Sequence, residues 1–579
     1  MNPCFNLSEE KWIRVLEEDG SIKEATLPEV FEKAHVYPGL AGETPTQNVA
    51  ILRFLMAVLY ASLFNQDYET PDDALNAWFE LWDAGCFPMA PITEYLARWR
   101  ERFWLFHDER PFCQVAAGRD GITMENAAGK AGLEKPGKPT AKGVQKASKL
   151  NGAIFESGNT DKLFNIATGS GKNSLSYSEA ARWLIHVIGF DDGGIKPYYE
   201  KNSSMNHADD LAKCTVAWLG SISPVHAESD TLFKTLMLNM VMLKNGEYTD
   251  EALWPHQRPS WEYDTPHTVE MTGVPLPDNP AELCTFLSRR IMLIRSGERV
   301  LGFVRYVGEA FAREAASTEQ WSLWVIPKAK KGEVSLPVPR SNRLPAQMWR
   351  EMGSLVAVRD GDYPPGVVRW VRLLSKPAQS PLRDVMCRFK YVKALYDVAQ
   401  SSSMTEILED SLTFSVGLLS EAGRAWLELL ASELELYNRV AWQLGLLAEQ
   451  LLSAEGGKVF EGKNKRTDTA EALRIDAQER FFYILDKPFR IWLQGLRAED
   501  DSQTRQERIQ QLRRIGRQNA MKCGREMLDQ VSPSAYRKRG KGEGENHNTA
   551  PEAWLLFRRA INKLIQMDTD QSPEGGADI

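Results

Sequence analysis

The sequence predicts an α+β protein, with a large, irregular mixed α/β domain at the N-terminus and a four-helix bundle at the C-terminus. Its 579 residues exceed what one ordinary hydrophobic core holds, which predicts two or three domains. Residues 195–400 mix short strand-like runs with proline-rich loops, whereas apolar residues recur at helical spacing beyond about residue 404. We therefore expect the main division between residues 1–400 and 401–579.

The N-terminal domain is expected to open with a short strand and to contain a buried helix. Residues Trp12–Val15 are strand-like and precede a turn at Gly20. Thr44 is a favourable N-cap, and Pro45 suits the first position of the helix that follows. Residues 49–63 are apolar on nearly every face, which predicts that this helix is buried.

Three later segments of this domain also have marked patterns. Ser176 and Glu179 form a capping-box pattern, which predicts a helix that ends near Gly189. Residues 117–150 are rich in Gly, Ala, Lys and Pro and lack apolar periodicity, so we expect a loop that is mobile or orders only on a partner. The run Trp321–Ile326 is strand-like.

Four long helices are expected in the C-terminal domain. Apolar residues spaced three and four apart from Leu427 to Leu451 predict the first helix. The second and third are expected at about 468–492 and 503–528, and the fourth begins at Thr549 with another capping box. Polar loops between them favour an up-and-down bundle. The acidic residues 569–579 are predicted to be a disordered tail.

Charge is distributed unevenly along the chain. The net charge of −8 argues against a free-standing protein that binds nucleic acid non-specifically. The third helix of the bundle nevertheless carries seven cations between Arg505 and Arg525, against the single acid Glu507. Such a helix suits the phosphates of a nucleic-acid strand, and the alternative is a solvated face with ion pairs inside the helix. The candidate contacts are Arg505, Arg508, Arg513, Arg517 and Lys522.

Cysteine usage and hydropathy predict a cytoplasmic protein. The seven cysteines are scattered without a CxxC pair, which is typical of reduced thiols and not of disulfides or a zinc site. The first residues have no signal-peptide pattern, and no uninterrupted apolar run approaches the roughly 20 residues that span a bilayer. We expect no membrane partner.

No catalytic motif is present, and we expect no enzyme, no metal and no cofactor. The chain lacks a phosphate-binding loop of Walker type, an HExxH motif and a GxSxG elbow. Asp191 and Asp192 beside two glycines could form the metal-binding turn of a nuclease, and the alternative is a solvated turn after a helix. His186 lies within an amphipathic helix, where a structural histidine is expected and not a ligand.

Several segments, taken together and in order along the chain, resemble the CasA (Cse) family. They are residues 5–7, 12–15, 27–31 and 34–35, the helix from Thr44 with Arg53–Leu55, Arg110–Gln114, Leu163–Asn165, Ser176–Arg182 and Gly189–Gly194. No single motif is decisive, but the ordered set is fairly specific. The resemblance covers most of the chain, because the C-terminal four-helix bundle also belongs to the family pattern.

The resemblance implies the non-catalytic large subunit of a type I-E CRISPR Cascade complex, which takes part in antiviral defence. In that assembly, guide RNA pairs with target DNA while the protein reads a short adjacent motif in the duplex. The implied partners are guide RNA, the other Cascade subunits, target double-stranded DNA and a helicase-nuclease. The implied mechanism is local unwinding and R-loop formation. The alternatives are a metal-dependent nuclease that uses Asp191 and Asp192, or a purely structural scaffold.

The resemblance also implies elements that read the adjacent motif. The glycine loop maps onto Gly193 and Gly194, followed by Lys196, where residues without Cβ allow the backbone into a narrow groove. A plain C-cap and turn is the alternative. The basic finger maps onto Arg313, with Arg305 as a competing candidate, although the family residue there is a lysine.

Two further elements are carried over from the family. The wedge that opens the duplex maps onto Lys393, with Lys390 and Tyr391 beside it, and the alternative is that the aromatic residues there belong to a core strand. Phe164 and Asn165 match the segment that meets the guide RNA or neighbouring subunits, and burial in its own domain is the alternative for Phe164. The motif that is preferred stays open, because the finger and wedge depart from the family pattern.

Overall fold

The chain divides into two compact units in a computed structural model. The first unit comprises Met1–Ala378 and Cys387–Ser411, and the second comprises Gln379–Met386 and Leu412–Ile579. The residues that the structure describes are 3–65, 68–116, 144–151, 174–197, 211–263, 277–309, 318–326, 338–339, 347–356, 363–376, 380–383, 385–397, 403–461, 465–538 and 548–565.

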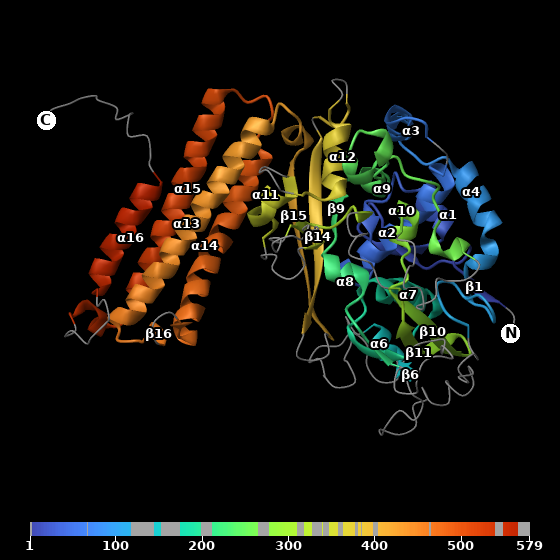
Figure 1. Cartoon of the computed structure of the whole chain (residues 1–579), viewed down its shortest axis with the longest axis horizontal. Helices are drawn as coiled ribbons and strands as arrows, with labels where there is room; N and C mark the ends of the chain where they lie inside the picture. Colours follow the sequence, from blue (N-terminus) through green and yellow to red (C-terminus); the bar gives the residue numbers. More distant parts are fainter. Residues whose placement is uncertain are drawn as a thin grey trace, which may run out of the picture. The chain divides into compact units, whose positions relative to one another are not determined.

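The first unit is a mixture of helices and small sheets, as the sequence predicts (Figure 1). Its helices are α1 (Leu27–Glu32), α2 (Pro45–Leu63), α3 (Pro71–Ala84), α4 (Met89–Arg98), α6 (Ala147–Leu150), α7 (Tyr177–Phe190), α8 (Trp218–Ile222), α9 (Leu232–Asn239), α10 (Pro280–Cys284), α11 (Met352–Val356) and α12 (Gly366–Leu374). Short 3-10 helices are η1 (Arg100–Arg102), η4 (Lys244–Gly246), η5 (Asp250–Ala252), η6 (Ser260–Glu262) and η8 (Met348–Glu351).

The strands form sheets of only two or three members. Two-stranded sheets are β1 (Cys4–Asn6) with β5 (Trp104–Phe106), β7 (Gly194–Pro197) with β8 (Leu211–Cys214), and β12 (Trp324–Val325) with β13 (Val338–Pro339). Three-stranded sheets have the orders β3 (Ile22–Ala25), β2 (Ile13–Leu16), β4 (Gly39–Leu40); β10 (Arg289–Ser296), β11 (Arg299–Val307), β6 (Val144–Lys146); and β15 (Ser403–Ser415), β14 (Met386–Asp397), β9 (Val225–Glu228). Small sheets of this kind confirm the irregular α+β class.

Helix α2 lies in the core of the first unit. Thr44 caps its N-terminus by accepting a hydrogen bond from the Gln47 N–H, and Pro45 occupies the first turn, as predicted. The helix packs against α4, α7, α9 and α10. It is long and apolar enough by composition to cross a membrane, but 83% of its most apolar window is buried inside the unit. Its apolar character is that of a core helix, which confirms the predicted burial.

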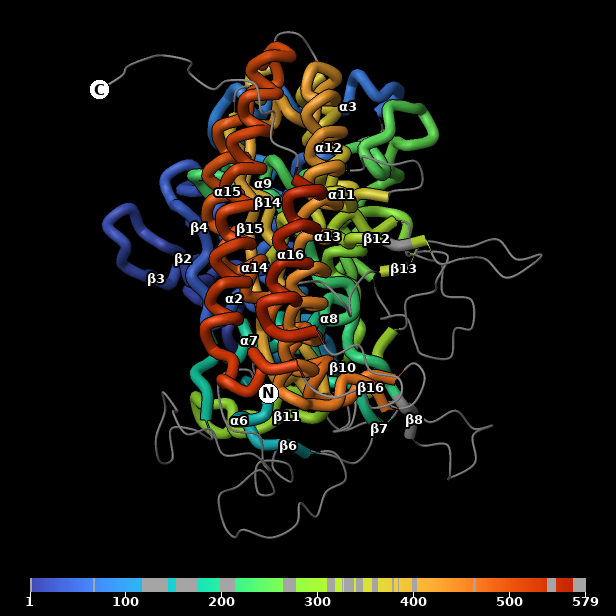
Figure 2. Tube along the Cα trace, turned by 90° about the vertical axis from the view of Figure 1, so that its left-hand side faces the viewer, coloured from blue at the N-terminus to red at the C-terminus, as the bar shows by residue number. Residues whose placement is uncertain are grey.

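Four long helices dominate the second unit (Figures 1 and 2). They are α13 (Arg424–Ala454), α14 (Asp468–Gln494), α15 (Ser502–Asp529) and α16 (Ala550–Leu564), with short pieces η10 (Val416–Leu419), β16 (Phe460–Glu461), β17 (Lys465–Arg466) and η11 (Pro533–Tyr536). Helix α13 packs against the other three, and α15 packs against α14 and α16. At Gly516 a Cβ would lie 2.3 Å from the Tyr437 ring, so the close approach of α15 to α13 requires glycine there.

Two local predictions differ from the structure. The end of the expected loop 117–150 is ordered, because residues 144–146 form β6 against β11 and residues 147–150 form α6, with Leu150 buried. The rest of that loop lies outside the described residues, as does the predicted tail 569–579. Of the strand-like run Trp321–Ile326, only two residues form strand β12.

Candidate nucleic-acid interface

The two glycines of the candidate loop form a turn between α7 and β7. Helix α7 starts with the predicted capping box of Ser176 and Glu179 and ends at Phe190, with Asp191 as its C-cap. Gly194 has a φ of +100°, which L residues with a side chain rarely adopt, and it begins β7. The turn therefore requires a glycine at position 194.

A buried cluster of charged side chains around Asp191 anchors this turn. The Asp191 carboxylate is 3% exposed and pairs with Arg289 Nε at 2.6 Å, with Lys196 Nζ at 3.2 Å and with an Arg305 terminal nitrogen. Burial opposes ionisation of Asp191, but the charges of Arg305, Lys196 and Arg289 outweigh it and hold the pKa of the carboxyl well below its usual range. Asp191 is therefore an ionised anchor for three cations.

The same cations orient the backbone of the turn. Lys196 Nζ donates to the carbonyl oxygens of Asp192, at 2.7 Å, and of Gly193, at 3.0 Å. An Arg289 terminal nitrogen also donates to the Asp192 oxygen, at 3.1 Å. Because the C=O and N–H of a trans peptide point in opposite directions, the N–H of Gly193 points away from the cations. That N–H has no acceptor among the described residues, although Gly193 itself is buried.

Further contacts brace the turn and leave it in a positive environment. The Asp192 carboxylate accepts a hydrogen bond from the Met404 N–H at 2.8 Å, and burial together with the Asp191 charge raises its pKa. Burial and the nearby Arg305 charge lower the pKa of Lys149. Four cations (Lys149, Lys196, Arg289 and Arg305) thus share two acids, which leaves a positive surplus that favours an anionic partner.

The geometry corrects both sequence interpretations of Asp191. It is not a solvated turn residue, because it is buried and bound on both oxygens. It is also a poor metal ligand, since three cations already neutralise it, and the described residues contain no group of three His, Cys, Asp or Glu side chains that could hold a metal. His186 is structural, as expected: its Nε2 lies 3.0 Å from Thr46 Oγ1, and burial lowers its pKa to about 3.

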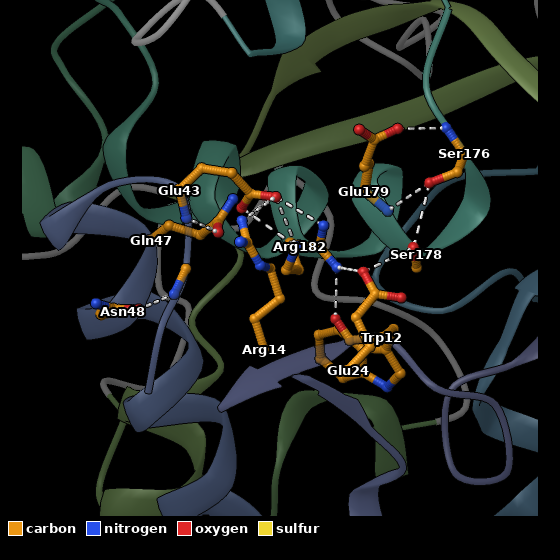
Figure 3. A network of polar contacts seen from close by, with 11 residues as sticks. Trp12, Arg14, Glu24, Glu43, Gln47, Asn48, Ser176, Ser178, Glu179 and Arg182 are labelled. Carbon is orange, nitrogen blue, oxygen red and sulfur yellow. Dashed lines mark hydrogen bonds and ion pairs between the residues drawn. The ribbon is translucent and has the colours of Figure 1, made fainter. Parts of the chain in front are cut away.

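The other end of α7 is fixed by a second network (Figure 3). The buried Arg182 guanidinium donates to the Trp12 carbonyl at 2.8 Å and to Glu24 and Glu43, each at 2.6 Å. Trp12 precedes β2, Glu24 lies on β3 and Glu43 precedes α2. Burial opposes the charged form of Arg182, but these carboxylates outweigh it and raise its pKa. One side chain therefore joins α7 to three N-terminal segments.

The predicted wedge residues lie within strand β14. Lys390 pairs with Glu409 at 2.8 Å and with Glu228 at 3.4 Å, and Tyr391 is buried. Lys393 is buried as well, and burial lowers its pKa. The pKa of Glu228 is about 2, because the hydrogen bond from His226 and the charges of His226 and Lys390 outweigh its burial. In this structure, none of the three wedge candidates projects freely into solvent.

Three other predicted residues fall outside the described part of the chain. They are the finger residue Arg313 and the guide-RNA candidates Phe164 and Asn165. The competing finger candidate, Arg305, lies on β11, and its guanidinium binds Asp191. The structure also shows two residues that sequence reasoning missed. Arg289 orients the turn from nearly one hundred positions away, and Ile195, directly after the glycines, is 71% exposed.

Apart from Arg525, which pairs with Asp529 inside the helix, the cations of helix α15 fall into two groups. Arg513 forms a bidentate pair with the buried Glu433 of α13, at 2.6 and 3.2 Å. Arg517 donates to Asn562 of α16, Arg508 lies 3.4 Å from Asp500, and Arg505 donates to the Asp500 carbonyl. The sequence interpretation considered partners only within the helix and missed these. By contrast, Arg514 and Lys522 are exposed and have no ion-pair partner among the described residues.

We predict that Arg513→Gln lowers stability and leaves nucleic-acid contacts nearly intact. The substitution leaves Glu433, 1% exposed on its side chain, without its cation. Since Arg513 is itself partly exposed, we expect a loss of about 1–3 kcal/mol in the free energy of unfolding. Denaturant titration of the full chain checks this, with Arg514→Gln as the matched control. Equal stability of the two variants would contradict the division into two groups.

Comparison with known proteins decides the family. The model of the CRISPR-associated protein Cse1 family matches residues 6–522, which include the turn, β14 and most of α15. The chain belongs to the Cse1 family. A curated Cse1 relative, CasA/Cse1 of Thermus thermophilus, is 29% identical over 300 residues, or 51% of this chain and 50% of that protein. The chain thus matches about half the length of the curated relative.

Solved Cse1 structures match over nearly the whole chain. Thermobifida fusca Cse1 is 26% identical, with 98% of both chains covered and a TM-score of 0.77. Cse1 from Acidimicrobium ferrooxidans is 25% identical, with 97% of this chain and 99% of that chain covered and a TM-score of 0.73. The α+β architecture described above is therefore that of Cse1.

Proposed function

We propose that this Cse1 chain is the large subunit of a type I-E Cascade complex that recognises the protospacer-adjacent motif in duplex DNA. It then promotes unwinding and R-loop formation and helps recruit the helicase-nuclease. Its partners would be guide RNA, the other subunits and target DNA. A chain of a CRISPR RNA-guided surveillance complex of known structure shares the fold, with a TM-score of 0.58 and 16% identity. This likeness and the family membership support the assembly.

The orientation of the glycine turn is the observation that carries the DNA-reading role. The carbonyls of Asp192 and Gly193 are drawn inward by Lys196 and Arg289, which turns the Gly193 N–H away from them. The minor groove presents acceptors at every base pair, and the Gly193 N–H would meet them once DNA binding uncovers the turn, which is buried at Gly193. That groove distinguishes A·T from T·A poorly, and a reader of this kind would tolerate several motif variants.

The remaining candidate contacts take different parts in this proposal. Lys196 would act by positioning the turn, because its Nζ is already bound to the turn's own carbonyls. Arg313 is kept as the basic finger, and Phe164 and Asn165 as guide-RNA or subunit contacts. Lys390, Tyr391 and Lys393 would have to leave their positions on β14 to enter the duplex as a wedge.

On α15, the exposed Arg514 and Lys522 are the best placed to contact the displaced strand. Arg505, Arg508, Arg513 and Arg517 have partners within the second unit. They would bind a strand only where those contacts leave donors free. The exposed Arg514 and Lys522 would therefore make the main electrostatic contact of α15 with the displaced strand.

Gly194→Ala is expected to reduce selection among flanking triplets by about tenfold or more. A Cβ at a φ of +100° strains the backbone by about 1–3 kcal/mol, so the turn must shift and the Gly193 N–H moves with it. The measurement is duplex binding by the guide-loaded assembly on DNA with a randomised flanking triplet. It is made with the wild-type chain, with the variant and without the chain.

Gly20→Ala is the matched control, since Gly20 also has a positive φ, +83°, in an open turn away from this site. It should bind and select as the wild type does. If removal of the whole chain leaves triplet selection unchanged, the motif-reading role fails and the structural scaffold replaces it. Divalent-ion-dependent cleavage of DNA by the purified chain would instead support the nuclease alternative.

A further inference from the structure

A hollow of about 240 Å³ lies in the first unit, between the C-terminal half of α12 and the 3-10 helix η4. None of the candidate interface residues lines it. Three cations do, Arg369, Arg372 and Lys376, against the single acid Glu247. Their spacing of three and four places the cations on one face of the helix and its continuation. A basic hollow of this kind suits an anion.

The charges in this hollow are not balanced by the described residues. A terminal nitrogen of Arg369 lies 3.1 Å from Glu247 Oε1. The Arg369 guanidinium stacks on the Tyr363 ring, with its central carbon Cζ 4.1 Å from the ring centroid. Arg372 donates one hydrogen bond to the Val356 carbonyl, but its Nε is buried without a partner. Burial and the neighbouring Arg369 charge lower the pKa of Arg372. Lys376 is exposed and has no ion pair among the described residues.

The helix dipole accounts for only part of this charge. Cations near a helix C-terminus are stabilised by the equivalent of about half a negative charge. Glu247 neutralises Arg369, which leaves the charges of Arg372 and Lys376 against that half charge. Among the described residues, an excess of more than one positive charge therefore remains at this partly buried site. Buried polar groups are usually satisfied, so the unpartnered Arg372 Nε indicates a missing acceptor.

The backbone opposite α12 keeps the wall of the hollow in place. Gly246 has a φ of +62°, and a Cβ there would lie 2.6 Å from the carbonyl carbon of Arg369 and from the N of Trp370. Its neighbour Asn245 also has a positive φ, and its N–H donates to Gln320 Oε1 at 3.0 Å. The close approach of η4 to α12 thus requires the glycine, which indicates a formed wall and not an incidental surface dip.

We propose that this hollow binds a phosphate of the target-DNA backbone, with Arg372 and Lys376 as its ligands and Arg369 at the rim. The choice of occupant rests on the DNA-binding function proposed above. A phosphodiester carries one negative charge and several acceptor oxygens, which match the uncompensated charge and the unpartnered guanidinium nitrogen. Such a contact fixes the protein's register on the duplex and carries no sequence information.

Thermal unfolding of the full chain in inorganic phosphate tests the pocket itself. At constant ionic strength, replacing chloride by phosphate should raise the Tm of the wild type, because a ligand that binds only the folded state stabilises it. Arg372→Gln and Lys376→Gln should lose most of this rise. Lys234→Gln removes an exposed cation elsewhere and should keep the rise. A rise of equal size in all four proteins would overturn the proposal.

The salt dependence of duplex binding by the guide-loaded assembly tests the occupant. Loss of one phosphate contact in Lys376→Gln should lower the slope of log affinity against log salt by about one, equally for every flanking triplet. If inorganic phosphate binding is lost while this slope is unchanged, the hollow takes a free phosphate and the backbone assignment is overturned. Failure of the motif-reading role would appear differently, as lost triplet selection with an intact slope.

Discussion

Asp191→Asn is expected to lower the free energy of unfolding by about 3–5 kcal/mol and to abolish selection among flanking triplets. The amide keeps the size of the carboxyl group but removes the charge that Arg289, Arg305 and Lys196 share. Three cations would then face one another at a buried site with only Asp192 nearby. Lys196 and Arg289 also hold the carbonyls of the turn, so the turn should lose its orientation together with stability.

The pH dependence of stability gives a second readout for Asp191. The folded pKa of its carboxyl lies well below the unfolded value of about 4. Its contribution is therefore fully present above that unfolded value and is lost as the pH falls below it towards the folded pKa. Wild type and Asp191→Asn should differ most at neutral pH, and the difference should begin to shrink below about pH 4, as denaturant titrations between about pH 3 and 7 would show.

Asp230→Asn is the matched control for this prediction. Asp230 pairs with Lys234 at 2.8 Å on the surface, where an ion pair contributes little. The control should keep nearly wild-type stability and triplet selection. If Asp191→Asn behaved like Asp230→Asn in both measurements, the anchoring role of the cluster would be wrong.

Arg182→Gln is expected to destabilise the chain by about 3–5 kcal/mol, because it removes the cation from a buried network. Glu43 would keep only Arg14, at 3.5 Å, and the Trp12 carbonyl would lose its donor (Figure 3). A glutamine can replace at most part of the hydrogen bonding and none of the charge. Thermal and denaturant unfolding of the full chain measure the loss.

The exposed Arg100, which binds Glu9 through two nitrogens at 2.7 and 3.0 Å, is the control for Arg182. Its pair with Glu9 lies in solvent, so Arg100→Gln should change the midpoint of unfolding only slightly. A similar change in both variants would mean that the buried network contributes no more than a surface pair. Arg182→Gln should also weaken triplet selection, since Arg182 lies on α7 and the glycine turn directly follows that helix.

Helix starts could be predicted from the sequence because their signals are local. Each predicted N-cap side chain accepts a hydrogen bond from the backbone N–H three residues later. The structure has all three caps, at Thr44, at Ser176 with Glu179 and at Thr549 with Glu552. The first helix of the second unit was also predicted from apolar periodicity, which depends on the chain's own spacing and not on distant partners. Its predicted range, from Leu427 to Leu451, lies within the observed Arg424–Ala454.

Side-chain roles at the candidate site could not be predicted in the same way. The partner of Arg513 is Glu433, eighty positions earlier, and the partners of Asp191 include Arg289 and Arg305 on strands β10 and β11. Nothing in the neighbouring sequence indicates such pairs. Lys196 likewise resembles a surface cation in sequence, and only the fold shows that its Nζ is turned inward. Resemblance pointed to the turn, and the structure shows which of the candidate side chains are already bound within the fold.

Helix α7 also sets a distance. Arg182 fixes one point of the helix to the N-terminal strands, and Asp191 fixes the glycine turn nine residues later. At a rise of 1.5 Å per residue, the helix keeps these two anchors about 13 Å apart along its axis. One inserted residue between them would move the turn by about 1.5 Å and rotate it by about 100° around the helix axis, out of phase with its ion cluster. An insertion or deletion between Arg182 and Asp191 should therefore be tolerated far less than a substitution of a surface residue in the same segment.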